Sequence, residues 1–85
     1  MDRVIAVFDN RNHSMQFASI LKRMGIVNRT VSTPRELSVS CGISVIFPYD
    51  NVKQAKMILF KNGFVNNVKM YLVRNNDSYK KYKPI

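Results

Sequence analysis

The sequence of 85 residues has little of the residues that build disulfides, metal sites and phosphate-binding loops. It contains one cysteine, one histidine, three glycines and no tryptophan. A single cysteine cannot form an internal disulfide, so the fold depends on its hydrophobic core. One histidine and one cysteine leave a zinc ion almost without ligands, and the three isolated glycines form no phosphate-binding loop. We therefore expect no metal and no cofactor.

Acidic side chains and long apolar runs are also scarce. Five scattered acidic residues offer no paired carboxylates for hydrolysis, so a carrier or binding protein is expected rather than a self-contained enzyme. No apolar run approaches the length of about 20 residues that a membrane span needs. The first residues lack the apolar core and cleavage site of a signal peptide. The expectation is a cytoplasmic protein with no membrane partner.

Positive charge is abundant, and it is unevenly distributed. The formal net charge is +9, with a net +2 over residues 1–52 and a net +7 over residues 53–85. Such a field attracts nucleic acid, acidic lipid or an acidic protein. Frequent asparagine, lysine and isoleucine also fit the surface of a protein from an AT-rich genome, so the charge alone does not select a partner.

The apolar pattern predicts alternating strands and helices. Apolar or β-branched runs predict strands at residues 4–8, 26–31, 43–47 and 69–73, the second at a sheet edge. Apolar residues three and four apart predict a helix over 13–24 and a second one from Val52. Gly25 and Gly63 are placed to end these helices with positive φ.

This order predicts an α+β fold. Two split β-α-β units side by side would give a ferredoxin-like β-α-β-β-α-β sandwich, with a four-stranded antiparallel sheet and two main helices on one face. A sheet with a different strand order is the main alternative. Residues 1–74 would form the single domain, and residues 75–85, which show no apolar periodicity, a flexible basic C-terminal tail.

The segment between the second and third predicted strands carries the features of a short helix. Thr33 suits the N-cap, Pro34 the first helical position, and Glu36 follows the cap by three residues. Gly42 suits the C-terminal end. The only thiol of the chain, Cys41, directly precedes that glycine.

Cys41 can be a reactive thiol or a small buried apolar residue. The C-terminal end of a helix disfavours a thiolate, whereas backbone N–H groups around Ser40, Cys41 and Gly42 could face an anion. Free cysteines are often buried, which supports the second interpretation. A catalytic pair of Cys41 with His13 is conceivable only if the start of the first helix approaches the central loop.

The run Ser-Thr-Pro-Arg-Glu-Leu-Ser-Val-Ser-Cys-Gly-Ile at residues 32–43 resembles the hallmark segment of the putative Se/S carrier protein-like family. The resemblance extends over about residues 4–73. It implies that Cys41 carries sulfur or selenium as a persulfide or selenopersulfide, with donor and acceptor proteins as partners. The supporting residues that it implies are Thr33, Pro34, Arg35, Ser38, Ser40 and Gly42.

Within this resemblance, Thr33 and Pro34 would fix the short helix, Arg35 would stabilise the anion and Gly42 would give access. Val39 departs from the family pattern, because a small hydroxyl residue is common there. Two alternatives stay open from the residues alone. One is a non-catalytic basic module that binds nucleic acid or an acidic protein. The other is a small regulatory subunit that forms a homodimer through its sheet or a helix face.

Overall fold

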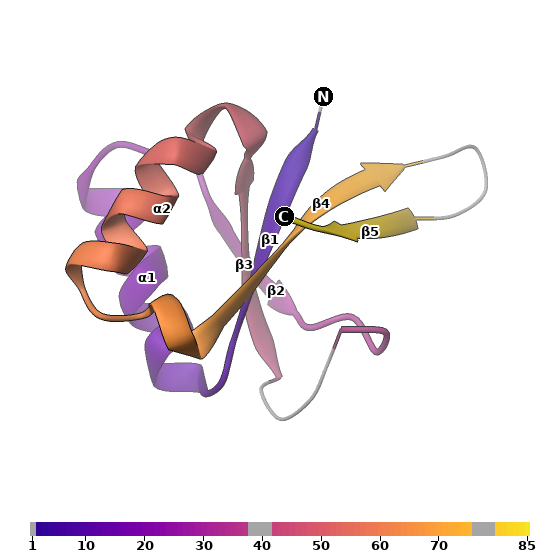
Figure 1. The fold of residues 1–85 in the computed structure, drawn as a ribbon, viewed down its shortest axis with the longest axis horizontal. Helices are drawn as coiled ribbons and strands as arrows, with labels where there is room; N and C mark the ends of the chain where they lie inside the picture. The colour runs from indigo at the N-terminus through magenta and orange to yellow at the C-terminus, as the bar shows by residue number, and fades with distance from the viewer. Residues whose placement is uncertain (1, 38–41, 76–79) are drawn as a thin grey trace.

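The computed structural model describes residues 2–37, 42–75 and 80–85 (Figure 1). It alternates strands and helices much as the sequence predicts. The elements in chain order are β1 (Arg3–Phe8), α1 (Arg11–Arg23), β2 (Arg29–Ser32), β3 (Ile43–Pro48), the 3-10 helix η1 (Tyr49–Asn51), α2 (Val52–Lys61), the 3-10 helix η2 (Val65–Asn67), β4 (Val68–Asn75) and β5 (Lys80–Pro84).

The strands form one sheet in the order β2-β3-β1-β4-β5, and every neighbouring pair is antiparallel. Strand β3 lies between β1 and β2, and β1 lies between β3 and β4, so each β-α-β unit is split by a strand of the other. Ile5 at the centre of the sheet pairs with Ile46 on one side and Tyr71 on the other. The predicted α+β fold with an antiparallel sheet and two helices is confirmed.

The prediction of four strands is wrong, because the sheet has a fifth strand. Strand β5 pairs with β4 from Asn75 opposite Lys80 to Tyr71 opposite Pro84. Residues 80–84 contain three lysines and one tyrosine, so no pattern of apolar residues predicted a strand there. Its pairing is instead supported by tertiary context, since Tyr82 packs against the cluster formed by Ile5, Val7 and Val73. Residues 76–79 of the predicted tail lie outside the described residues.

The predicted short helix is also corrected. Residues Arg35–Leu37 form a turn, closed by a 3.0 Å hydrogen bond from the Leu37 N–H to the Pro34 carbonyl. The Thr33 hydroxyl lies 2.6 Å from the Ser44 hydroxyl on the neighbouring strand, rather than capping a helix. The rest of the predicted helix, residues 38–41, lies outside the described residues.

The two main helices begin and end for local reasons. The Asn10 side chain caps α1 by accepting the His13 N–H at 2.9 Å. The predicted positive φ is confirmed at Gly25 (φ 75°) and at Gly63 (φ 74°), where each helix ends. Asp50 lies in η1, and α2 begins directly after Asn51 at Val52, as predicted.

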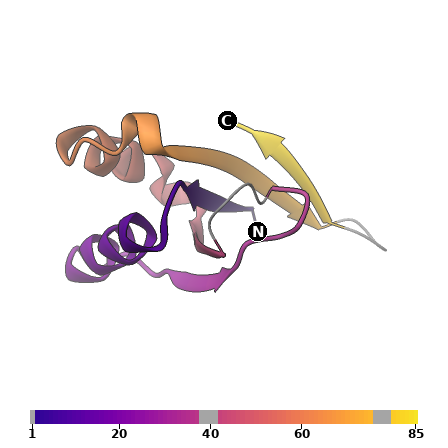
Figure 2. The same cartoon turned by 90° about the horizontal axis from the view of Figure 1, so that it is seen from below.

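Both helices pack on the same face of the sheet (Figure 2). Phe17 and Leu21 of α1, with Ala55, Ile58 and Leu59 of α2, are buried against strand residues whose side chains share that face: Val4, Ala6, Phe8, Val45, Phe47 and Met70. The Phe17 ring lies 5.3 Å from Phe8 and 5.9 Å from Phe47, centroid to centroid. This cluster is the main core.

The opposite face has a smaller cluster. Ile5 and Val7 of β1 and Val73 of β4 are buried there together with Leu37, which comes from the segment after β2. Leu37 is 9% exposed, so the described part of the 33–42 segment lies on the sheet face that the helices leave open. That segment is called the 33–42 loop below.

The second predicted strand is shorter than expected and shifted along the chain. Strand β2 begins at Arg29, while Ile26 belongs to the main core and Val27 is 75% exposed. Its predicted place at a sheet edge is confirmed by the strand order. Among the described residues, no helix is long and apolar enough to cross a membrane.

Candidate functional site

The base of the 33–42 loop is held by two hydrogen bonds that Thr33, the residue after β2, forms with Gly42 and with Ser44 of β3. The Thr33 N–H donates a 3.0 Å hydrogen bond to the Gly42 carbonyl. The Thr33 and Ser44 hydroxyls form a second hydrogen bond at 2.6 Å, and Ser44 is fully buried. Cys41 precedes Gly42 in the chain, so the residue predicted to carry sulfur is joined directly to this base. Cys41 itself lies outside the described residues, as do Ser38, Ser40 and Val39.

The described half of the loop is attached to the sheet through Leu37. Its side chain packs against Ile5, Val7 and Val73, a burial that contributes about 2 kcal/mol. Pro34 is partly buried, and its carbonyl accepts the turn hydrogen bond from Leu37. Among the supporting residues predicted from sequence, Thr33 and Pro34 therefore hold the loop in place, by contacts that differ from those of the expected helix.

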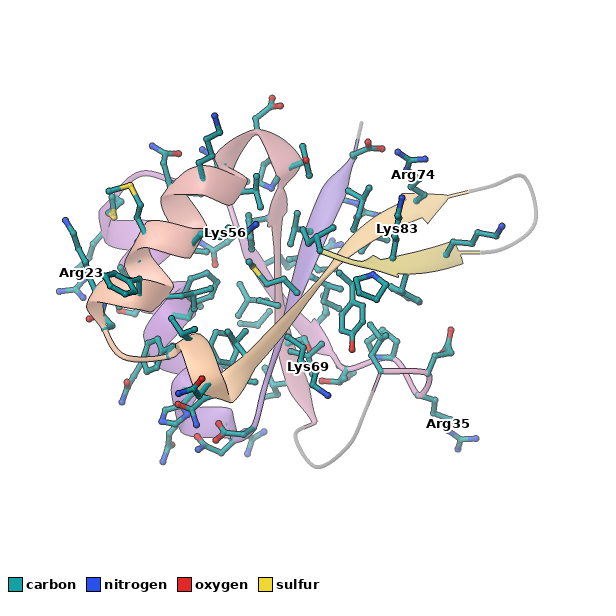
Figure 3. The ribbon with its side chains drawn as sticks, in the orientation of Figure 1. Arg23, Arg35, Lys56, Lys69, Arg74 and Lys83 are labelled. Atoms are coloured by element: carbon teal, nitrogen blue, oxygen red, sulfur yellow. The ribbon has the colours of Figure 1, made fainter. Side chains whose placement is uncertain are left out.

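Arg35 and Gly42 are both exposed. The Arg35 side chain extends away from the sheet (Figure 3). A Cβ added at Gly42 would meet no heavy atom within 4 Å among the residues described, so packing there does not require glycine. The predicted roles of Arg35 in stabilising an anion and of Gly42 in giving access stay predictions.

Tyr82 of β5 lies close enough to the 33–42 loop for a carboxylate of the loop to change the pKa of its hydroxyl. Burial against the sheet raises the pKa of its hydroxyl above the ordinary value of 10.0, and the Glu36 carboxylate raises it further, while the Arg3 guanidinium acts in the opposite direction. Glu36 belongs to the turn of the loop and Arg3 to β1. The loop, β1 and β5 therefore meet on this face.

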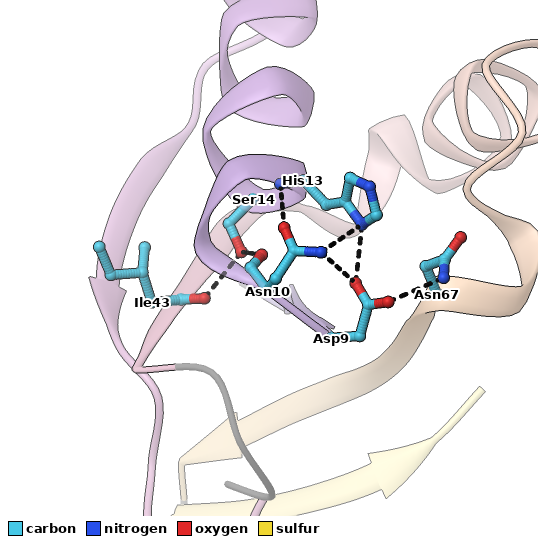
Figure 4. Close-up of polar contacts among 6 residues, drawn as sticks. All are labelled: Asp9, Asn10, His13, Ser14, Ile43 and Asn67. Atoms are coloured by element: carbon cyan, nitrogen blue, oxygen red, sulfur yellow. Dashed lines mark hydrogen bonds and ion pairs between the residues drawn. The ribbon is translucent and has the colours of Figure 1, made fainter.

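A polar cluster that the sequence analysis did not single out lies where β1 ends (Figure 4). The Asp9 carboxylate contacts His13 Nδ1 at 2.7 Å with one oxygen and accepts the Asn67 side-chain amide at 2.8 Å with the other. Asn10 Nδ2 lies 3.2 Å from the same His13 nitrogen. The hydrogen bond with His13 is the main cause that lowers the pKa of Asp9 below 3.8, helped by Asn67 and opposed by desolvation.

Only the contact between Asp9 and His13 could have been predicted from the sequence. Asp9 and His13 are four residues apart, the spacing at which two residues face each other near the start of a helix. Asn67 is 58 residues from Asp9, and the local pattern around it predicts only a loop. The His13 ring also packs on Phe64 with a centroid distance of 5.1 Å, so the cluster joins α1, β1 and the segment before β4.

The start of α1 contacts the start of β3. The buried Ser14 hydroxyl donates a 2.8 Å hydrogen bond to the carbonyl of Ile43, the second residue after Cys41. This approach of the first helix to the central loop is the condition set above for a pair of Cys41 with His13. The pair itself stays a hypothesis, because Cys41 lies outside the described residues.

A cavity of about 210 Å³ lies beside the polar cluster. Asp9, Asn67 and Lys69 line it together with Leu37 of the 33–42 loop, and Val7 and Phe8 belong to the same lining. The amide and ammonium groups are donors to an anion, while the Asp9 carboxylate disfavours one. The part of the chain that the structure describes has no cluster of three or more metal-ligating side chains.

Comparisons with known proteins identify a family for the chain but no individual relative. No curated protein and no solved structure matches the chain. The model of one family, described as "Putative Se/S carrier protein-like", matches residues 3–71. This range contains β1 to the first half of β4, and with them the whole 33–42 loop. The resemblance noted from the loop sequence is thus confirmed over most of the chain, which belongs to the Putative Se/S carrier protein-like family.

Proposed function

We propose that the protein carries sulfur or selenium between two partner proteins as a persulfide or selenopersulfide on Cys41. The family match over residues 3–71 is the observation that carries the proposal. The closed base of the 33–42 loop supports it, because the Thr33 N–H bonds the carbonyl of Gly42, the residue that follows Cys41 in the chain. The absence of any other cysteine leaves Cys41 as the one residue able to do this.

The transfer step needs no external oxidant. The Cys41 thiolate attacks the terminal sulfur of a donor persulfide, the donor S–S bond breaks and the donor thiolate leaves with the electron pair. The new S–S bond places the sulfane sulfur on Cys41, and an acceptor thiolate repeats the exchange. Arg35 would stabilise the anionic persulfide by its charge, and the exposed Gly42 would leave room for the partner.

A mass measurement tests the carrier function. The protein is incubated with a cysteine desulfurase and cysteine, and the intact protein is weighed. A gain of one sulfur atom that a thiol reductant removes is expected for the wild type, and no gain for Cys41→Ser. If the wild type gains no mass under conditions that load a known carrier, the proposal is wrong.

A second candidate function is a non-catalytic basic module that binds nucleic acid or an acidic protein. The net charge of +9 favours it, because a field of this sign attracts polyanions. A salt-dependent electrophoretic shift of single-stranded RNA or DNA that persists in Cys41→Ser would support this function.

We interpret the part from β1 to β4 as a ferredoxin-like unit to which β5 is added. The order β2-β3-β1-β4 and the placement of α1 and α2 on one face support this interpretation. The fifth strand extends the sheet beyond the four strands of such a unit.

A further inference from the structure

A groove of about 450 Å³ lies between α2 and the outer part of the sheet. Leu59 of α2, Val65 of η2 and Tyr71 of β4 line it, together with Pro84 of β5, and most of its lining is apolar. Val65 is 53% exposed, so part of this apolar surface faces solvent. A groove of this kind can receive an apolar side chain from a partner.

Two lysines line this groove, and none of the described residues that line it has an acidic side chain. Lys56 comes from α2 and Lys69 from β4, and both are exposed (Figure 3). Neither has an ion-pair partner in the part of the chain that the structure describes. The sequence from residue 51 to 76 contains no aspartate or glutamate at all. The charge of the groove is therefore complementary to an acidic ligand.

Among the described residues, the first residues of β4 pair with a strand on one side only. Val68 and Lys69 pair with Phe8 and Val7 of β1, whereas the pairing of β4 with β5 begins at Tyr71. The Ile85 N–H reaches the Met70 carbonyl at 3.1 Å, which leaves Val68 and Lys69 beyond the end of β5. An extended chain can lie along such an uncovered strand edge.

The groove shares two lining residues with the cavity of about 210 Å³ beside the polar cluster. Val68 and Lys69 line both of them, and Leu37 of the 33–42 loop lines the second. A chain that extends from the groove past Val68 and Lys69 would thus reach the cavity that Leu37 of this loop lines.

We propose that this groove binds an extended acidic segment of a protein partner. Carboxylates of the segment pair with Lys56 and Lys69, and one of its apolar side chains occupies the surface around Leu59 and Val65. That the partner is the donor or acceptor of sulfur rests on the proposed function. The binding of the segment does not, because none of the groove residues takes part in the transfer step.

Fluorescence anisotropy with a labelled synthetic peptide that alternates glutamate with leucine tests this binding on the full chain. The groove variant is Lys56→Glu with Lys69→Glu. The matched control, Lys22→Glu with Arg23→Glu on α1, lowers the net charge from +9 to +5 as well, and all four side chains are exposed. The groove variant should weaken peptide binding by about tenfold or more, and the control by about twofold or less.

Three outcomes would overturn the proposal. One is an equal loss of affinity in the two variants, which would show attraction to the net charge alone. Another is no binding of the peptide to the wild type. The third is that the groove variant loses affinity for single-stranded DNA or for anionic vesicles, while its affinity for the peptide is unchanged. That result would assign the groove to a nucleic acid or a membrane.

The Cys41→Ser variant separates this proposal from the carrier function. It should bind the peptide as tightly as the wild type. If the wild type binds the peptide but gains no sulfur from the desulfurase, the carrier function is wrong and the groove assignment stands. If sulfur is loaded and the peptide does not bind, the groove assignment alone is wrong.

Discussion

The two faces of the sheet are stabilised in different ways. The face under α1 and α2 has a core of four packed phenylalanine rings, Phe8, Phe17, Phe47 and Phe64, with aliphatic residues from both helices. The other face has the cluster around Ile5, Val7 and Val73, and its covering side chain from the 33–42 loop is Leu37. The first face contains the larger core, and the second carries the 33–42 loop and the cavity of about 210 Å³ that Leu37 lines.

The largest expected effect comes from the helix-covered face. Phe17 is fully buried, so Phe17→Ala should lower the free energy of unfolding by about 4 kcal/mol. Phe60→Ala is the control, because Phe60 is 77% exposed on α2 and its loss should change the free energy by less than about 0.5 kcal/mol. Urea unfolding followed by circular dichroism measures both. Similar losses in the two variants would contradict the placement of the core.

A matched pair of leucines compares the two faces directly. Leu59→Ala under the helices should cost about 3 kcal/mol, and Leu37→Ala on the opposite face about 2 kcal/mol. Leu37 packs against a smaller cluster and its loop can relax, which explains the smaller cost. Equal or reversed costs in urea unfolding would show that the 33–42 loop is part of the main core.

The hydrogen bond that joins α1 to β3 should have a smaller effect. Ser14→Ala removes the donor to the Ile43 carbonyl and should lower the free energy of unfolding by about 1 kcal/mol. Ser19→Ala, at an exposed position of the same helix, should leave it almost unchanged. In the sulfur-loading assay, Ser14→Ala should slow the gain of mass if the position of β3 affects the thiol, while an unchanged rate would limit Ser14 to a structural role.

The polar cluster should stabilise the fold at neutral pH and lose this effect in acid. Because the folded state lowers the pKa of Asp9, the carboxylate stabilises the fold above its ordinary pKa and loses this contribution as the pH falls through the lowered value. Asp9→Asn should therefore reduce the dependence of the melting temperature on pH in the acidic range. Asp50→Asn, outside the cluster, is the control. An acidic profile that Asp9→Asn leaves unchanged would contradict this account.

The fold was predictable wherever local chemistry decides it. The apolar run of β1, the helical spacing of α1 and the positive φ at Gly25 and Gly63 follow from residues close in sequence. Strand β5 was not predictable, because lysine-rich residues pair with β4 through tertiary contacts of Tyr82. The turn at 35–37 was mistaken for a helix because Thr33 has a stronger partner, Ser44, across the sheet.

The site was predictable only in part, for the same reason. The motif of the 33–42 loop identified the family, whereas the roles predicted for Thr33 and Pro34 rested on a helix that a turn replaces at 35–37. The cluster of Asp9, His13 and Asn67 depends on a contact between residues 58 positions apart. Spacing within one helix or strand carries no information about such a contact, so the structure was needed to find it.

The composition of β5 has a consequence for behaviour at high concentration. This strand forms one edge of the sheet, and it combines Pro84 with the alternating cations Lys81 and Lys83. Proline removes an N–H donor from that edge, and like charges repel a second copy of the same strand. Edge-to-edge stacking of sheets is therefore disfavoured here, and the chain resists this route to amyloid-like aggregation.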